Sequence, residues 1–130
     1  MVARILVADD ELSIRIYVEE TLQEEGHEVH TADCPAQALP LAEFMKFDLV
    51  VSDVNMPGMN GFQFRNALRA LPGAEAVPFL YMSGADPVAE QAIARELGTD
   101  RLLLKPFSIP DLLREVGAFL GTGRTERAAV

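Results

Sequence analysis

Residues 49–61 read LVVSDVNMPGMNG and decide the fold. They open with Leu49–Ser52, a short uncharged run that is typical of a strand buried on both faces of a sheet. The run ends at Asp53, and the segment that follows is rich in the Asn, Pro and Gly residues that mark turns. Residues 62–71 then have the spacing of a helix. The stretch is therefore one strand–loop–helix unit with a carboxylate at the carboxyl end of its strand.

The same unit recurs along the chain. Besides 49–52, we predict strands over residues 4–8, 28–32, 79–82 and 102–104, and helices over 12–25, 35–45, 62–71, 87–98 and from Ser108 to about Leu120. Five apolar strands that alternate with helices indicate a parallel sheet covered on both faces. The expected fold class is α/β, a doubly wound (βα)5 sheet with the strand order 2-1-3-4-5 of flavodoxin-like folds. The length predicts one domain, residues 1–121, followed by a frayed tail, residues 122–130.

Turn and cap residues support these boundaries. Gly26 fits the position just after a helix end, and Asp86 before a proline fits a helix start. Ser108 is expected to cap the last helix, and Asp33 lies close to the start of the second helix, which it is expected to cap. Pro40 lies inside that second helix, where a proline costs ~3 kcal/mol. We therefore expect a kink or a late start there.

Composition excludes several classes of protein. The 130 residues are 49% hydrophobic and 24% charged, which is ordinary for a globular protein. No apolar run approaches the ~20 residues of a membrane helix, and the apolar start is too short for a signal peptide, so we expect a cytoplasmic protein. A net charge of −9 does not provide the basic face that nucleic acid requires. Cys34, His27 and His30 lack the neighbours of a metal site, and we interpret them as structural.

Polar residues stand where the predicted strands end. Asp9 and Asp10 follow the first strand, Asp53 ends the third, Ser83 follows the fourth and Lys105 follows the fifth. The carboxyl ends of parallel strands meet at one edge of a sheet, which is where open α/β sheets bind their ligands. Each residue alone has an ordinary interpretation, such as a helix N-terminus for the acids or a solvated surface position for the lysine. Their shared position favours a functional site.

Three carboxylates in one crevice repel each other, by ~4 kcal/mol for two charges ~4 Å apart at an effective dielectric of ~20. The single positive charge of Lys105 does not offset three negative ones. A bound divalent cation would offset the remaining negative charge. A small number of oxygen ligands at an open site suits Mg²⁺. Mg²⁺ is a usual partner of phosphates, and an aspartate can attack phosphorus to form an aspartyl phosphate. The expected chemistry is phosphoryl transfer to Asp53.

Four motifs in this order resemble the receiver domain of two-component response regulators. They are Asp9-Asp10, the stretch from Ser52 to Gly61, Ser83-Gly84-Ala85 and Lys105-Pro106-Phe107, and the resemblance runs from about Arg4 to Leu120. It implies that Asp53 is the phosphoacceptor and that Mg²⁺ is the cofactor. It also implies a partner, either a histidine kinase or a phosphotransfer protein, and an output protein that the sequence does not name.

The resemblance assigns a role to each site residue. Asp9, Asp10 and Asp53 are similar to the Mg²⁺-binding acids, and the backbone carbonyl of Asn55 would be a further ligand. Ser83 matches the hydroxyl that turns toward the phosphoryl group and starts the switch. Lys105 matches the lysine that pairs with a phosphoryl oxygen. The peptide bond between Lys105 and Pro106 is expected to be cis, which costs little before proline.

Two positions depart from the pattern of the family. Leu102 stands where an aromatic residue often forms the second part of the switch, so the aromatic form of the output is in doubt. Arg101 stands where receivers that pair through the fourth helix, fifth strand and fifth helix often carry an acid. We therefore do not assume that dimer on sequence grounds.

The leading hypothesis is a phosphoacceptor switch that is not a conventional enzyme and acts by protein–protein contact, with no direct binding of nucleic acid or membrane. A phosphatase of the haloacid-dehalogenase type would want an acid two residues after its nucleophile, and here that residue is Asn55. A flavin-binding carrier would want a phosphate loop after the first strand, where Asp9-Asp10-Glu11 would repel a phosphate. A pseudo-receiver that binds partners without phosphorylation stays open because of Leu102.

Overall fold

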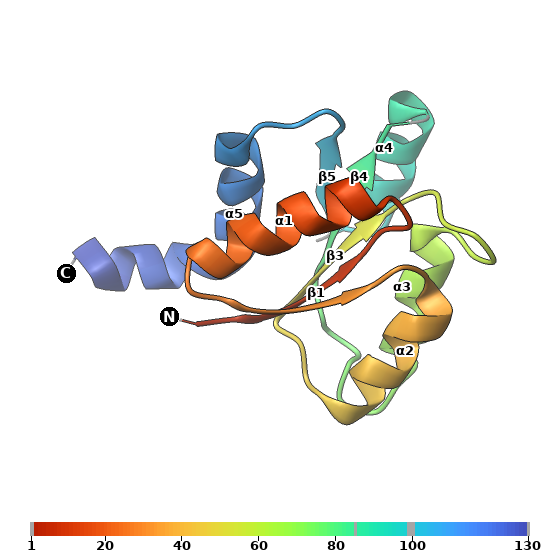
Figure 1. The fold of residues 1–130 in the computed structure, drawn as a ribbon, viewed down its shortest axis with the longest axis horizontal. Coiled ribbons are helices and arrows are strands. Elements are labelled where there is room, and N and C mark those ends of the chain that lie inside the picture. The colour runs from red at the N-terminus through yellow and green to blue at the C-terminus, as the bar shows by residue number, and fades with distance from the viewer. Residues whose placement is uncertain (1, 85, 99–100, 130) are drawn as a thin grey trace.

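The computed structural model describes residues 2–84, 86–98 and 101–129, with side chains described as far as Leu120. It contains five strands and five helices in strict alternation (Figure 1). The strands are β1 (Arg4–Ala8), β2 (Glu28–Ala32), β3 (Leu49–Asp53), β4 (Phe79–Ser83) and β5 (Arg101–Leu104). The helices are α1 (Leu12–Glu24), α2 (Pro35–Phe44), α3 (Gly61–Arg69), α4 (Pro87–Glu96) and α5 (Ile109–Ala129).

The strands form one parallel sheet in the order β2-β1-β3-β4-β5, which confirms the predicted fold class and strand order. The register aligns the carboxyl ends of the central strands. Ala8 at the end of β1 pairs with Ser52, Asp53 pairs with Met82, and Ser83 pairs with Leu104. The residues that end or follow these strands therefore lie along one edge of the sheet.

Each strand contributes alternate side chains to two separate cores, because successive residues of a strand point to opposite faces. Ile5 and Val7 of β1 pack with residues of α1 and α5, such as Val18 and Leu112. The intervening Leu6 packs with residues of the opposite cluster, which includes side chains of α2, α3 and α4. Figure 1 shows the same division, with α1 and α5 together on one side of the sheet and α2 and α3 on the other. All five residues of β3 are buried, as expected for a strand covered on both faces.

Most of the predicted cap residues are confirmed. Gly26 has a φ of 91° just after α1, and the Asp86 side chain accepts a hydrogen bond from the Ala89 backbone at the start of α4. The Ser108 hydroxyl likewise accepts from the Asp111 backbone N–H at 3.2 Å. The glycine supplies a left-handed backbone without a steric penalty, and the two caps satisfy N–H groups that a helix leaves unpaired.

Helices α1 to α4 end within two residues of the predicted positions, but three other features of the helices differ from the predictions. The N-cap of α2 is Cys34 and not Asp33, whose backbone N–H instead donates to the Gln37 side chain at 3.0 Å. Of the kink or late start that Pro40 predicted, the late start is wrong, since α2 begins at Pro35 and includes Pro40, and the kink stays a prediction. The backbone of α5 stays helical to Ala129, past the predicted end at about Leu120. Extending an existing helix costs much less conformational free energy than starting one. This is how α5 continues through residues that have a weak helix propensity.

Among the described residues, we find no helix that combines the length and the apolar character needed to cross a membrane.

Candidate functional site

An open cleft of about 430 Å³ lies at the carboxyl edge of the sheet. The described residues that line it come from four loops that follow strands, and they are Asp10, Glu11, Asp53, Asn55, Gly84 and Lys105. Three of the five residues predicted at this edge, Asp10, Asp53 and Lys105, thus line one cleft. Asp9 contacts the cleft lysine from a fully buried position, and Ser83 is fully buried and does not line the cleft.

The backbone of Asp53 is held by the start of α3. Asn60 caps this helix through a reciprocal pair of hydrogen bonds with Gln63, each 2.8 Å long. The next residue, Gly61, donates its backbone N–H to the Val54 carbonyl at 2.7 Å. A Cβ atom at this glycine would lie 2.5 Å from the Asp53 carbonyl oxygen, which is closer than atoms can approach. Only glycine allows the helix to sit this close to the strand that carries Asp53.

Asp9, Asp10 and Asp53 form the acidic cluster that the sequence predicts. One carboxylate oxygen from each residue lies within 4.8 Å of the others. Asp9 is fully buried and Asp53 is 5% exposed, whereas Asp10 is exposed. The donor set is all oxygen and opens onto the cleft, so these residues fit a hard divalent cation such as Mg²⁺.

Burial and mutual repulsion make the two inner carboxylates hard to ionise. Burial raises the pKa of Asp9, although its carboxylate accepts a 2.8 Å hydrogen bond from the Glu11 backbone and lies beside the Lys105 ammonium. Burial, together with the nearby Asp9 charge, raises the pKa of Asp53 to about 6. Perturbed carboxylates of this kind cluster at functional sites.

Lys105 is the cation of the cleft. Its Nζ atom lies 3.2 Å from Asp9 Oδ2, 3.3 Å from Glu11 Oε1 and 3.5 Å from Asp53 Oδ1. Burial alone would lower the pKa of this lysine, but the Asp9 and Asp53 carboxylates outweigh it and the pKa is raised. The ammonium group is therefore charged at any physiological pH, and it points toward the same carboxylates that would hold a metal.

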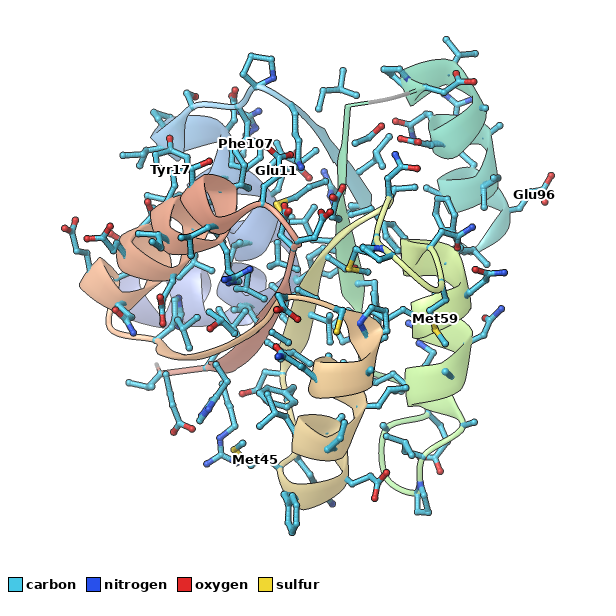
Figure 2. The ribbon with its side chains drawn as sticks, turned by 45° about the vertical axis from the view of Figure 1, so that its right-hand side comes forward. Glu11, Tyr17, Met45, Met59, Glu96 and Phe107 are labelled. Atoms are coloured by element: carbon cyan, nitrogen blue, oxygen red, sulfur yellow. The ribbon has the colours of Figure 1, made fainter. Side chains whose placement is uncertain are left out.

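The loop after β5 fixes the position of this lysine. Its backbone N–H donates to the Ser83 carbonyl at 2.7 Å, and the peptide bond between Lys105 and Pro106 is cis, the geometry that the resemblance implied. The following Phe107 packs against Tyr17 of α1, with ring centroids 6.0 Å apart (both labelled in Figure 2). The lysine is thus held between β4 and an aromatic contact to α1.

Ser83 and Asn55 share a partner that the sequence did not predict. The Ser83 hydroxyl donates to Oε1 of Glu90, and the Asn55 side-chain amide donates to Oε2 of the same carboxylate at 3.4 Å. The Asn55 backbone N–H lies 3.3 Å from Asp53 Oδ1. The role of the Asn55 carbonyl as a metal ligand stays a prediction, and Ala85, the last residue of the Ser83 motif, lies outside the described residues.

The two residues that depart from the family pattern have defined places. Leu102 pairs in register with Tyr81 of β4 and packs against the core cluster that contains it. Tyr81 is fully buried against Phe62, with ring centroids 4.6 Å apart. An aromatic ring is therefore present beside Leu102, but on the neighbouring strand. Arg101 forms an ion pair with Glu115 of α5, with 2.6 Å between Nε and Oε1.

Sequence reasoning also missed Glu11 and Arg15. Glu11 entered the sequence interpretation only through the acidic stretch Asp9-Asp10-Glu11, yet its carboxylate is the third partner of Lys105. Arg15 donates from Nη1 to the Asp9 carbonyl at 2.8 Å. Glu90 could have been found from the sequence, because it is a charged residue on the apolar face of α4, four residues before Ala94 and seven before Leu97. A carboxylate at such a position needs a polar partner.

Comparison with known proteins agrees with this geometry. The response regulator receiver domain model matches residues 5–117. The transcriptional regulatory protein PcoR of Escherichia coli is 32% identical over 127 residues, which cover 98% of this chain and 55% of the relative. The transcriptional regulatory protein PrrA of Mycobacterium leprae is 36% identical over 117 residues, covering 90% and 49%. The chain thus spans about half the length of these relatives.

Among solved structures, the chemotaxis response regulator CheY4 of Vibrio cholerae superimposes with a TM-score of 0.83 at 35% identity. This match covers 92% of the present chain and 99% of CheY4. The family match, the relatives and the fold agree with the acidic cluster, the buried serine and the lysine found at the sheet edge. The chain belongs to the receiver domain family of two-component response regulators.

Proposed function

We propose that this chain is a Mg²⁺-dependent phosphoacceptor in which Asp53 receives a phosphoryl group from a phosphohistidine. The donor would be a histidine kinase or a phosphotransfer protein. One observation carries the proposal: the Asp53 carboxylate lies in an open cleft between an acidic cluster and the Lys105 ammonium, 3.5 Å away. A nucleophile, a cation and a set of metal ligands are the parts that phosphoryl transfer needs.

In the proposed reaction an Asp53 carboxylate oxygen attacks phosphorus. The phosphorus–nitrogen bond of the donor breaks, and the donor imidazole leaves with the electron pair of that bond. Because the pKa of Asp53 is about 6, the carboxyl is mostly ionised at neutral pH and can act as the nucleophile. The carboxylates of Asp9, Asp10 and Asp53 would hold Mg²⁺, whose charge offsets theirs and that of the phosphoryl oxygens.

The remaining side chains stabilise the product. The Lys105 ammonium already lies within ion-pair distance of Asp53 and would pair with a phosphoryl oxygen. The Ser83 hydroxyl would turn to a second phosphoryl oxygen and so change the surface near α4. The chain would catalyse its own phosphorylation and dephosphorylation without acting on other substrates, so it is not a conventional enzyme.

The output would be contact with another protein, or with the part of a longer regulator that this sequence does not include. We propose that this domain does not bind nucleic acid directly, and its net charge of −9 supports this. The proposal does not concern the additional segments of its longer relatives. A cytoplasmic location would place the domain with its phosphodonor. The family assignment also removes the flavin carrier and the haloacid-dehalogenase phosphatase as alternatives.

Intact mass after incubation with Mg²⁺ and acetyl phosphate tests the proposal. We expect one phosphate adduct, lost in Asp53→Asn and in excess EDTA. Glu43→Gln, which neutralises an exposed acid on α2, is the matched control and should label like the parent chain. If no adduct forms under conditions that label another receiver domain, the phosphoacceptor proposal is wrong, and a pseudo-receiver that binds partners without phosphorylation takes its place.

A further inference from the structure

We infer that Glu90 is a positioning residue that holds the Ser83 hydroxyl away from the phosphoryl site until Asp53 is phosphorylated. This inference rests on the proposed function. Ser83 is fully buried, it does not line the cleft, and its hydroxyl donates to the Glu90 carboxylate. The serine that would donate a hydrogen bond to the phosphoryl group therefore donates to Glu90 in the unphosphorylated protein.

A hydroxyl group has one proton to donate. The Ser83 proton can serve either the Glu90 carboxylate or a phosphoryl oxygen, but not both. A hydrogen bond to a charged acceptor is among the stronger kinds, so leaving Glu90 opposes the change of partner. Glu90 therefore biases Ser83 toward the unphosphorylated arrangement, and phosphorylation must outcompete it.

The position of Glu90 also connects this competition to α4. Glu90 lies in the first turn of α4, and it and Ala94 are the buried residues of that helix. Its second carboxylate oxygen accepts from the Asn55 side chain in the loop after β3. The first turn of α4 is thus joined to β4 and to the loop after β3 mainly through the polar contacts of the Glu90 side chain. When Ser83 leaves, one of these contacts is lost and α4 is less firmly held.

The affinity of the protein for a phosphoryl analogue measures how strongly Glu90 holds the Ser83 hydroxyl away from the phosphoryl site. Beryllofluoride with Mg²⁺ can occupy the phosphoryl site without a covalent step, and its dissociation constant can be measured by calorimetry. We expect Glu90→Ala to bind beryllofluoride about tenfold more tightly than the parent, because Ser83 no longer has to leave a charged acceptor. Glu90→Gln keeps a neutral acceptor in the same place and should fall between the two.

Loss of a negative charge near the cleft would also tighten anion binding, so the serine must be tested in the same experiment. In a Ser83→Ala background, Glu90→Ala should change the beryllofluoride affinity much less than it does in the parent, because no hydroxyl competes and only the charge effect remains. Glu96→Ala is the control for charge and helix propensity, since Glu96 is an exposed acid on the same helix and points away from the molecule (Figure 2). It should bind like the parent chain.

The outcomes separate the inference from the proposed function. An equal change on Glu90→Ala in both serine backgrounds would show a charge effect alone and overturn the inference, while the phosphoacceptor function stands. Weaker binding by Glu90→Ala with an intact fold would overturn it too. A parent chain that does not bind beryllofluoride in Mg²⁺ would refute the proposed function itself. If Glu90→Ala does not fold, Glu90→Gln in the two backgrounds gives the same comparison with a smaller factor.

Discussion

The substitution Asp53→Asn is expected to stabilise the folded protein at neutral and alkaline pH in the absence of Mg²⁺. The Asp53 side chain is 7% exposed, and burial and the Asp9 carboxylate raise its pKa from 3.8 to about 6. Ionising it in the folded protein therefore costs free energy that the unfolded chain does not spend. One pKa unit corresponds to about 1.4 kcal/mol, so the full penalty is on the order of 3 kcal/mol.

The pH window follows from the direction of the shift. Below about pH 3, Asp53 is protonated in both the folded and the unfolded chain, and the penalty is absent. Between about pH 3 and 6 the folded protein keeps a proton that the unfolded chain progressively loses, so stability falls as pH rises. Above pH 6 the penalty is complete. Asp53→Asn, which carries no charge at any pH, should thus gain stability over the parent progressively through this window.

Urea unfolding at pH 4 and pH 8, in EDTA, measures the effect. We expect a difference of less than about 1 kcal/mol at pH 4 and up to about 3 kcal/mol in favour of Asp53→Asn at pH 8, with Glu43→Gln unchanged at both. Saturating Mg²⁺ should narrow the difference, because a bound cation stabilises the parent by about 2.7 kcal/mol at a hundred times its dissociation constant. If Asp53→Asn is less stable than the parent at pH 8, or the difference does not depend on pH, the electrostatic account of the cleft is wrong.

Three further substitutions test other parts of the site. Lys105→Met should slow phosphorylation by acetyl phosphate by about 10²-fold or more, measured as the initial rate of adduct formation, because the Asp53 carboxylate loses the one ammonium group beside it in the described structure. Asp9→Asn should weaken Mg²⁺ binding by at least about tenfold by calorimetry, and unchanged affinity would exclude Asp9 as a ligand. Gly61→Ala should lower the free energy of unfolding by about 1–3 kcal/mol, since the added methyl group would lie 2.5 Å from the Asp53 carbonyl oxygen; a stability equal to that of the parent would show that α3 is seated less tightly.

The apolar periodicity predicted the strands because it is a short-range pattern, and the strand order was taken from the doubly wound fold class that alternating strands and helices indicate. The run at residues 4–8 and the run at 28–32 are strands with the predicted bounds. Once the strands are parallel, the polar residues that follow them must meet at one edge, which is why Asp9, Asp53 and Lys105 could be placed from sequence alone.

What the sequence did not show depends on contacts between distant elements. The partner of the Ser83 hydroxyl is set by how α4 packs on the sheet, and Glu90 is seven residues away from it along the chain. The pairing of Leu102 with Tyr81 follows from strand register, which a list of apolar residues does not fix. The N-cap of α2 is Cys34, which makes no side-chain cap, so cap chemistry alone misplaced the cap by one residue, although the predicted start of the helix at Pro35 is correct.

The close packing of α3 against β3, the strand that carries Asp53, affects how other sequences of this family should be interpreted. The need for glycine at position 61 is steric, because the Asp53 carbonyl occupies the space where a side chain would begin. That need does not depend on whether the aspartate is ever phosphorylated, and a receiver that had lost its metal ligands would have it as well. A glycine at this position in a newly sequenced protein therefore identifies the architecture and not the chemistry. To separate active from inactive members of the family, the glycine should be set aside and the acids and the lysine of the cleft compared instead.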